Sequence, residues 1–265
     1  MARISQALLN VLDNGMYIPV SKNFAIRRYA FPKDSDVQKK LCESMKEVYR
    51  SAFQNQLPAY PFLHGDHASL SNRLVCLLYE RANKQQPVGF NASYLTRGYG
   101  ESIFHVGVTI VNEAQRGKGG MSKFYGVNLL LFLLMHGSNH VFTGLTSNSS
   151  MLPLMEKYGN DYYPDWRNPD LKPKKWQLDV AKFLLANHAQ DHALGHMAYL
   201  DEDTLVVKCY SKGDGSVKMY EKNMQSRNPI LRKFMEDRID ILDGDSQYFI
   251  FRPKTLPMWI LGAVS

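Results

Sequence analysis

The feature that most constrains the fold is a β-branched segment that runs through a glycine-rich turn into a long apolar stretch. Residues 102–111 (SIFHVGVTIV) predict a buried strand, and 122–137 (SKFYGVNLLLFLLMHG) predict a helix buried on several sides. Between them lies QRGKGG at 115–120. Such a turn aims consecutive backbone N–H groups and a helix N-terminus at one point, which suits a bound phosphate. The segment predicts a domain of mixed strands and helices with an anion site at the turn.

Hydrophobic periodicity predicts further elements on both sides of this segment. The polar stretches ANKQQ (82–86) and RGYGE (97–101) predict turns, and YYPDWRNPDLKPKK (162–175) predicts an irregular crossing. The expected strands are 23–29, 73–80, 87–96, 140–146, 204–210 and 247–252, and the expected helices are 37–53, 149–158 and 176–188. No boundary between Arg73 and Gly159 resembles a linker. A break near 160–175 is compatible with the sequence, but the two late strands fit the same sheet, so we expect one domain over 1–265.

Composition narrows the class of protein. The chain has 265 residues, of which 45% are hydrophobic and 22% charged, so it is globular rather than disordered. Three widely spaced cysteines (Cys42, Cys76, Cys209) predict neither a disulfide framework nor a zinc ribbon. No apolar run reaches the length of a membrane span, and no signal peptide is recognisable, so a soluble, cytoplasmic protein is expected.

The net charge of +7 favours an anionic ligand or partner without choosing among nucleic acid, a membrane surface and a phosphorylated cofactor. The basic patches are short and lack interleaved aromatic residues, so nucleic acid is not the expected partner. Two familiar phosphate motifs are excluded. Lys118 is followed by Gly119 rather than a hydroxyl residue, so the turn is not a P-loop, and Gly117-Lys118-Gly119 does not continue as a dinucleotide fingerprint.

The turn resembles the coenzyme A loop of the GNAT superfamily of N-acyltransferases. That pattern, [QR]-x-x-G-x-[GA], is met from Arg116 through Gly120, and Met121 stands at the small sixth position. A second motif of the family, N-x-x-a-x-x-L-Y-x-K-x-G, is similar to 148–159 (NSSMLPLMEKYG). The order of hairpin, strand, loop, long helix, strand and helix is also similar. The resemblance covers roughly residues 22–165, and 166–265 would extend the domain or complete its sheet.

This resemblance implies a fold, an activity and a set of binding residues. The fold would be α/β (α+β), a mixed central sheet flanked by helices with an enlarged C-terminal portion. The activity would be transfer of an acyl group, typically acetyl, from acyl-coenzyme A to a small-molecule or peptide amine, with no metal required. The implied coenzyme-binding residues are Val108, Ile110 and Val111 at the strand end, Arg116, Gly117, Lys118, Gly119, Gly120 and Met121 around the pyrophosphate, and Asn148 at the pantetheine arm.

The residues that would move protons are less clear from the sequence. The slot that holds a general-acid Tyr in the family falls on Met155, which has no proton to donate, and Tyr158 lies nearly one turn further on. As general base we expect His105, with Glu101 and Glu113 as alternatives; imidazole has a suitable ordinary pKa for accepting an amine proton. His105 and Tyr158 are therefore the catalytic candidates, and simple packing is the alternative for each.

Two further hypotheses remain open from the sequence. His188, His192 and His196 recur at four-residue spacing, which on a continuous helix would line one face for a metal ion. Gly195 interrupts that helix and no acidic ligand is expected on the same face, so packed or exposed histidines are the expectation. The departure at Met155 also leaves open a non-catalytic module that binds acyl-coenzyme A or another protein.

Overall fold

The computed structural model describes residues 14–53, 57–115, 118, 120–137, 139–194, 197–208, 226, 228–240 and 243–254. Its strands are β1 (Asn14–Pro19), β2 (Phe24–Ala30), β3 (Arg73–Glu80), β4 (Asn83–Gly98), β5 (Glu101–Val111), β6 (Val141–Thr146), β7 (Gly159–Tyr163), β8 (Tyr199–Asp201), β9 (Val206–Lys208) and β10 (Ser246–Pro253). Its α-helices are α2 (Ser35–Ala52), α3 (Gly120–His136), α4 (Leu152–Tyr158), α5 (Lys175–His188) and α6 (Pro229–Glu236).

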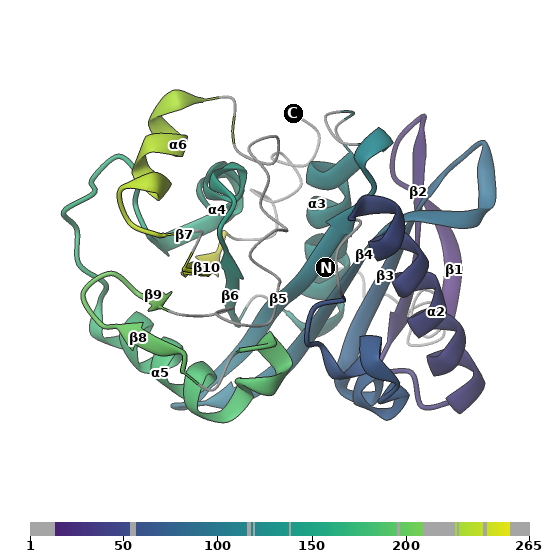
Figure 1. Cartoon of the computed structure of the whole chain (residues 1–265), viewed down its shortest axis with the longest axis horizontal. Coiled ribbons are helices and arrows are strands. Elements are labelled where there is room, and N and C mark those ends of the chain that lie inside the picture. Colours follow the sequence, from purple (N-terminus) through teal and green to yellow (C-terminus); the bar gives the residue numbers. More distant parts are fainter. Residues whose placement is uncertain are drawn as a thin grey trace.

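These strands form one sheet in the order β1-β2-β3-β4-β5-β6-β10-β9-β8, with β7 paired to β10. Neighbouring strands are antiparallel except β5 and β6, which are parallel. Figure 1 shows the helices arranged around this twisted sheet. The predicted mixed sheet flanked by helices is therefore confirmed. No helix in the part of the chain that the structure describes is long and apolar enough to cross a membrane.

The helices lie on both faces of the sheet. Successive residues of a strand point to opposite faces, so one strand supplies apolar side chains to helices on both sides. Val75 and Leu77 of β3 pack in one core with α2, whereas Leu74 and Leu78 pack in another with α3. A third core joins α5 to the β5, β6 and β10 region of the sheet. The side chain of Asp34, which caps α2, accepts bonds from the backbone of residues 36 and 37 at 2.9 and 3.0 Å.

A bulge in β5 is the feature that positions the site. The register with β4 pairs His105 with Tyr94 and Val108 with Ala92, so two residues of β5 oppose one residue of β4. Because of the extra residue, the side chains beyond the bulge point to the opposite face of the sheet from the one that simple alternation would give. Before the bulge, Phe104 packs in the core with α3; beyond it, Val108 packs in the core with α2. The bulge therefore turns the end of β5 over relative to its beginning.

The parallel pairing between β5 and β6 ends at the same point. Its register runs from Ile103 opposite Val141 to Val106 opposite Gly144 and goes no further in the described residues. β6 continues instead along β10, where Thr146 pairs with Gln247. The two parallel strands thus part beyond Val106, as their courses in Figure 1 also show. A gap opens in the middle of the sheet, next to the N-terminus of α3.

Several elements differ from the sequence-based expectation. β4 begins at Asn83, so the polar ANKQQ segment is mostly strand rather than turn. The turn expected over 97–101 is confined to Tyr99 and Gly100, whose φ angles of 51° and 74° match a two-residue hairpin turn. β1, β7, β8 and α6 were not predicted. All four are short, although Leu231, Phe234 and Met235 of α6 recur at helical spacing and are buried. Cys209 lies outside the described residues.

Candidate functional site

A cavity of about 110 Å³ occupies the gap between β5 and β6. Its lining comes from both faces of the sheet. Phe53 and Tyr60 contribute from the α2 side, and Asp191 and His192 from the turn after α5. The strands and the α3–α4 side supply the remaining lining residues: His105, Val106, Gly107, Val108, Thr109, Ile110, Tyr125, Leu145, Thr146, Asn148, Met151, Ser246 and Phe249. The cavity therefore connects the two layers through the sheet.

A second, narrower cavity of about 20 Å³ adjoins the first on the α3–α4 side. Its lining is almost wholly apolar: Val106, Tyr125, Leu129, Met151, Leu154, Met155, Tyr158, Phe249 and Phe251. Four of these residues, Val106, Tyr125, Met151 and Phe249, also line the first cavity. The two cavities therefore adjoin at these four residues, and the larger one also has polar side chains, among them His105, Asn148 and Asp191.

The residues expected at the strand end fall in different places. Val108 and Ile110 line the larger cavity, whereas Val111 packs in the core with α3. Asn148 also lines this cavity, and its side-chain oxygen accepts a bond from the Ser150 backbone N–H at 2.9 Å. That bond uses the amide oxygen as a helix cap and leaves the amide nitrogen for another partner.

The glycine-rich turn is described only in part. Arg116, Gly117 and Gly119 lie outside the described residues. The backbone N–H of Lys118 donates to the Gln115 carbonyl at 3.4 Å, and the Lys118 side chain is exposed. α3 begins at Gly120 and continues through Met121, which places its N-terminus directly after the turn, as the sequence predicts.

His105 reaches the larger cavity from β5. It is 2% exposed, and its Nδ1 lies 2.9 Å from the Thr143 hydroxyl on β6. No partner for its Nε2 is present in the described part of the chain. Burial, together with the nearby His192 and Arg73, holds the pKa of His105 well below its ordinary value. The ring is therefore neutral at physiological pH and can present an unprotonated nitrogen to the cavity.

His192 lies against His105, with ring centroids 4.2 Å apart. Its two nitrogens contact two tyrosine hydroxyls: Nε2 bonds to Tyr94, and Nδ1 lies 3.1 Å from Tyr248. Burial, reinforced by His188, lowers the pKa of His192 to about 3. A neutral imidazole has one N–H and one lone pair, so one tyrosine donates to His192 and the other accepts. Both nitrogens are thus occupied, and His192 holds its position rather than offering a free nitrogen.

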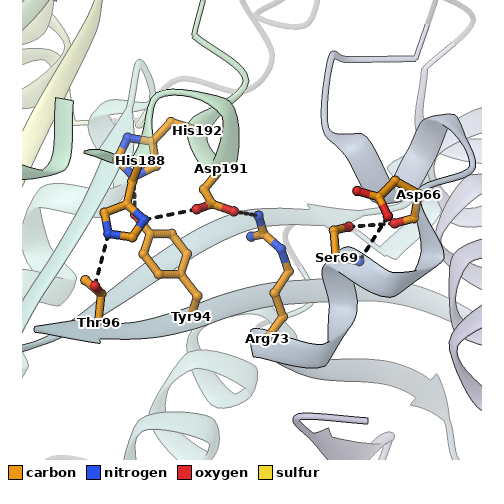
Figure 2. A network of polar contacts seen from close by, with 8 residues as sticks. All are labelled: Asp66, Ser69, Arg73, Tyr94, Thr96, His188, Asp191 and His192. Atoms are coloured by element: carbon orange, nitrogen blue, oxygen red, sulfur yellow. Dashed lines mark hydrogen bonds and ion pairs between the residues drawn. The ribbon is translucent and has the colours of Figure 1, made fainter. Parts of the chain in front are cut away.

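Asp191 is the charged side chain of the larger cavity. Figure 2 shows its carboxylate between Arg73 and His188, with one oxygen 2.5 Å from the Arg73 guanidinium and the other 3.0 Å from His188 Nδ1. His188 Nε2 in turn lies 3.0 Å from the Thr96 hydroxyl. Burial raises the pKa of Asp191, but the His188 bond and the Arg73 charge outweigh it, so the pKa lies below its ordinary value. Asp191 is an ionised carboxylate held in one orientation.

The structure corrects the expectation that no acidic side chain shares a face with these histidines. α5 ends at His188, and a 3₁₀ turn at Gln190–His192 follows. Asp191 lies beside His188 because residues three apart are neighbours on a helical turn, so the carboxylate shares a face with the histidines. His196 lies outside the described residues. Within the described ranges, no group of three or more His, Cys, Asp or Glu side chains could hold a metal ion.

We expect the stability of the protein to fall between pH 7 and pH 5. An unfolded histidine takes up a proton near pH 6.5, whereas folded His192 stays neutral to about pH 3, so the unfolded state binds more protons in this window. His192 alone should cost about 2 kcal/mol at pH 5 relative to neutral pH, and His105 acts in the same direction. Urea unfolding at both pH values measures this. If the free energy of unfolding of His192→Gln fell by the same amount between pH 7 and pH 5, the His192 imidazole would not be the cause.

The catalytic candidates of the sequence take different positions. His105 lines the larger cavity, and Tyr158 lines only the smaller one, where it is 3% exposed. Met155 lines the smaller cavity too. Sequence reasoning did not find Arg73 or Tyr125. The position of Tyr125, one turn after the glycine-rich segment, could have marked it as a site residue. Arg73 begins an ordinary strand, and nothing in the sequence around it indicates a functional role.

Comparisons with known proteins concern mainly the fold. No family model matches the sequence, and no curated protein matches it significantly. Solved structures that resemble the chain include the NatC complex bound to Gag peptide and CoA, at 16% identity and TM-score 0.37, over 49% of this chain and 81% of that one. Another is the ribosomal-protein-S5-alanine acetyltransferase from Vibrio fischeri, at 8% identity and TM-score 0.38, over 56% and 85%.

A third is an acetyltransferase of the GNAT family from Bacillus anthracis. It shares 18% identity with this chain at a TM-score of 0.32, and the match covers 56% of this chain and 87% of that one. In fold, the chain resembles these acetyltransferases, and the similarity concerns about half of the chain.

Proposed function

We propose that the protein transfers an acyl group from acyl-coenzyme A to an amine. The observation that carries this proposal is that β5 and β6 part beyond Val106 and Gly144. The cavity between them is lined by residues from both faces of the sheet. On one face of the sheet lies α3, the helix that follows the glycine-rich turn. The other face carries the neutral imidazole of His105 and the carboxylate of Asp191, which line the same cavity. Two substrates can therefore approach one point from opposite sides.

The coenzyme would enter from the α3–α4 side. The turn at 116–120 and the N-terminus of α3 suit the pyrophosphate, because backbone N–H groups and the helix dipole both favour an anion there. The pantetheine arm would lie against the apolar residues that line the smaller cavity, and the Asn148 amide nitrogen would donate to one of its carbonyls. Val108 and Ile110 would border the thioester at the end of β5.

The amine would approach from the α2–α5 side, where Tyr60, His105 and Asp191 line the larger cavity. Its nitrogen attacks the thioester carbon, the new C–N bond forms and the C–S bond breaks. The proton lost by the nitrogen would pass to Nε2 of His105 in the tautomer that donates its Nδ1–H to the Thr143 hydroxyl. A weakly basic imidazole suffices, because the nitrogen becomes strongly acidic once it bonds to the carbonyl carbon. We propose a small-molecule or peptide amine as acceptor.

Binding and turnover test this proposal separately. Calorimetry should show tighter binding of acetyl-coenzyme A than of ADP, because the pantetheine arm adds contacts that ADP lacks. Release of free thiol from acetyl-coenzyme A should then rise with at least one member of a panel of amines. Equal affinity for the two ligands would contradict a pantetheine channel. Tight binding without thiol release under any condition would favour a non-catalytic module that binds acyl-coenzyme A.

A further inference from the structure

The larger cavity has a negative charge on its lining, although the chain as a whole has a net charge of +7. Among the described residues that line it, the imidazoles of His105 and His192 are neutral at physiological pH and Asp191 is ionised. Every other side chain of this lining is of an uncharged type. A molecule that fills the cavity therefore meets a carboxylate as the charged group of the wall.

Arg73, the ion-pair partner of Asp191, lies behind this wall. Its side chain is 0% exposed and does not line the cavity, whereas the Asp191 side chain is 24% exposed and does. The guanidinium packs against the rings of Phe62 and Tyr94, 5.1 and 5.6 Å from their centroids. A cation in the cavity is therefore nearer to the carboxylate than to the guanidinium, so attraction exceeds repulsion.

The Asp191 carboxylate has capacity for a further donor. One oxygen accepts from Arg73 and the other from His188, as Figure 2 shows. Each oxygen has two lone pairs, so each is able to accept one more hydrogen bond. The aromatic rings of Phe53 and Tyr60 line the same cavity and suit a cation as well. This part of the cavity therefore fits an ammonium group.

That ammonium group is unlike the nitrogen that reacts. The reacting nitrogen has to be a neutral amine, and contact with a carboxylate stabilises the protonated form instead. A neutral imidazole such as His105 has no such effect. Asp191 precedes His192, whose ring centroid lies 4.2 Å from that of His105, so the carboxylate and the proposed base serve the same cavity from neighbouring positions. The cavity thus has a neutral part for the nucleophile and an anionic part for a second group.

We propose that Asp191 determines acceptor specificity by binding a second ammonium group, while the other amino group of the acceptor attacks the thioester carbon. This inference rests on the proposed function. The second group keeps its proton throughout, so it contributes binding and adds no step to the reaction. The substrate class is an aliphatic diamine, either a free one or the pair of amino groups in a short peptide that contains lysine.

A series of four-carbon amines tests this inference on the unmodified protein. Putrescine, aminobutanol, butylamine and γ-aminobutyrate carry an ammonium, a hydroxyl, a methyl and a carboxylate at the far end of the chain. We expect kcat/KM, per amino group, to be about tenfold or more higher for putrescine than for butylamine, and lowest for γ-aminobutyrate. The difference should lie in KM, because Asp191 would bind the second ammonium equally before and during the reaction.

Glycyl-lysine amide and glycyl-norleucine amide make the same comparison for a peptide. A preference for the lysine peptide together with equal rates for putrescine and butylamine would identify a peptide as the source of the second charge. A preference for putrescine with equal rates for the two peptides would identify a free diamine. Both results support a second ammonium at Asp191.

Variants of Asp191 locate the group that selects the charge. Asp191→Asn should bring the ratio of kcat/KM for putrescine to that for butylamine close to one, and unfolded protein cancels from this ratio. Arg73→Met, Asp191→Asn should give the same low ratio, because it removes the buried charge together with the carboxylate. Asp203→Asn is the matched control, since Asp203 is 73% exposed and lies outside the cavity, and it should keep the ratio of the unmodified protein.

Four results would overturn the inference. Equal kcat/KM for all four amines and for both peptides would overturn it while the proposed function stands. A ratio that persists in Asp191→Asn would show that another group selects the charge. A preference for γ-aminobutyrate would mean that the cavity attracts an anion. If no amine raises thiol release, the proposed function itself fails, and the inference with it.

Discussion

Gly107→Ala is expected to destabilise the protein by about 3 kcal/mol and to abolish binding of acyl-coenzyme A. A Cβ at Gly107 would lie 2.0 Å from the Ala92 carbonyl oxygen and 3.2 Å from its carbon. Both are backbone atoms of the paired strand, so relief requires that β4 and β5 move apart. This is the bulge that opens the cavity, and its movement would change the cavity as well as the sheet. Urea unfolding and calorimetry with acetyl-coenzyme A measure the two effects.

Gly100→Asn, in the turn that joins the same two strands, is the matched control. Gly100 has φ 74°, which Asn tolerates better than other residues, and a Cβ there has nothing within 4 Å. We expect it to change the free energy of unfolding by less than about 1 kcal/mol. If Gly107→Ala were as stable as this control and still bound acyl-coenzyme A, the bulge would not be the feature that shapes the cavity.

Asp191→Asn is expected to cost about 3 kcal/mol of stability, although the two side chains have nearly the same shape. The change leaves the guanidinium of Arg73, which is 0% exposed, without its counter-ion. Burial already lowers the pKa of Arg73, and Asp191 opposes that shift. The double variant Arg73→Met, Asp191→Asn should recover much of the loss, because it removes the buried charge as well. A double-mutant cycle in urea measures this coupling.

The exposed pair of Lys172 and Asp203 supplies the comparison. Their side chains are 72% and 73% exposed, so water and salt screen their attraction. Asp203→Asn makes the same chemical change at the surface and should have no measurable effect on unfolding. If both Asn variants were equally stable, the charge of Asp191 would not be needed to balance Arg73.

The sequence alone determined the parts of this protein that depend on neighbouring residues. The apolar run at 73–80 and the β-branched segment at 102–111 predicted β3 and β5, and the apolar stretch after the glycines predicted α3 from the turn onward. Such patterns act over one element, because side-chain direction repeats every two residues in a strand and about every 3.6 in a helix. For that reason the position of the loop, the strand before it and the helix after it could be predicted together.

Only the tertiary structure decided which of these residues meet. Arg73 and Asp191 are 118 residues apart in the chain and form an ion pair, because the turn after α5 packs against the strands near the start of β3. The bulge at Gly107 reverses the alternation of β5, so His105 and Thr109 face different layers although the sequence spaces them for one face. Contacts of this kind depend on how distant elements pack and on one extra residue in a strand register, and neither leaves a periodic signal in the sequence.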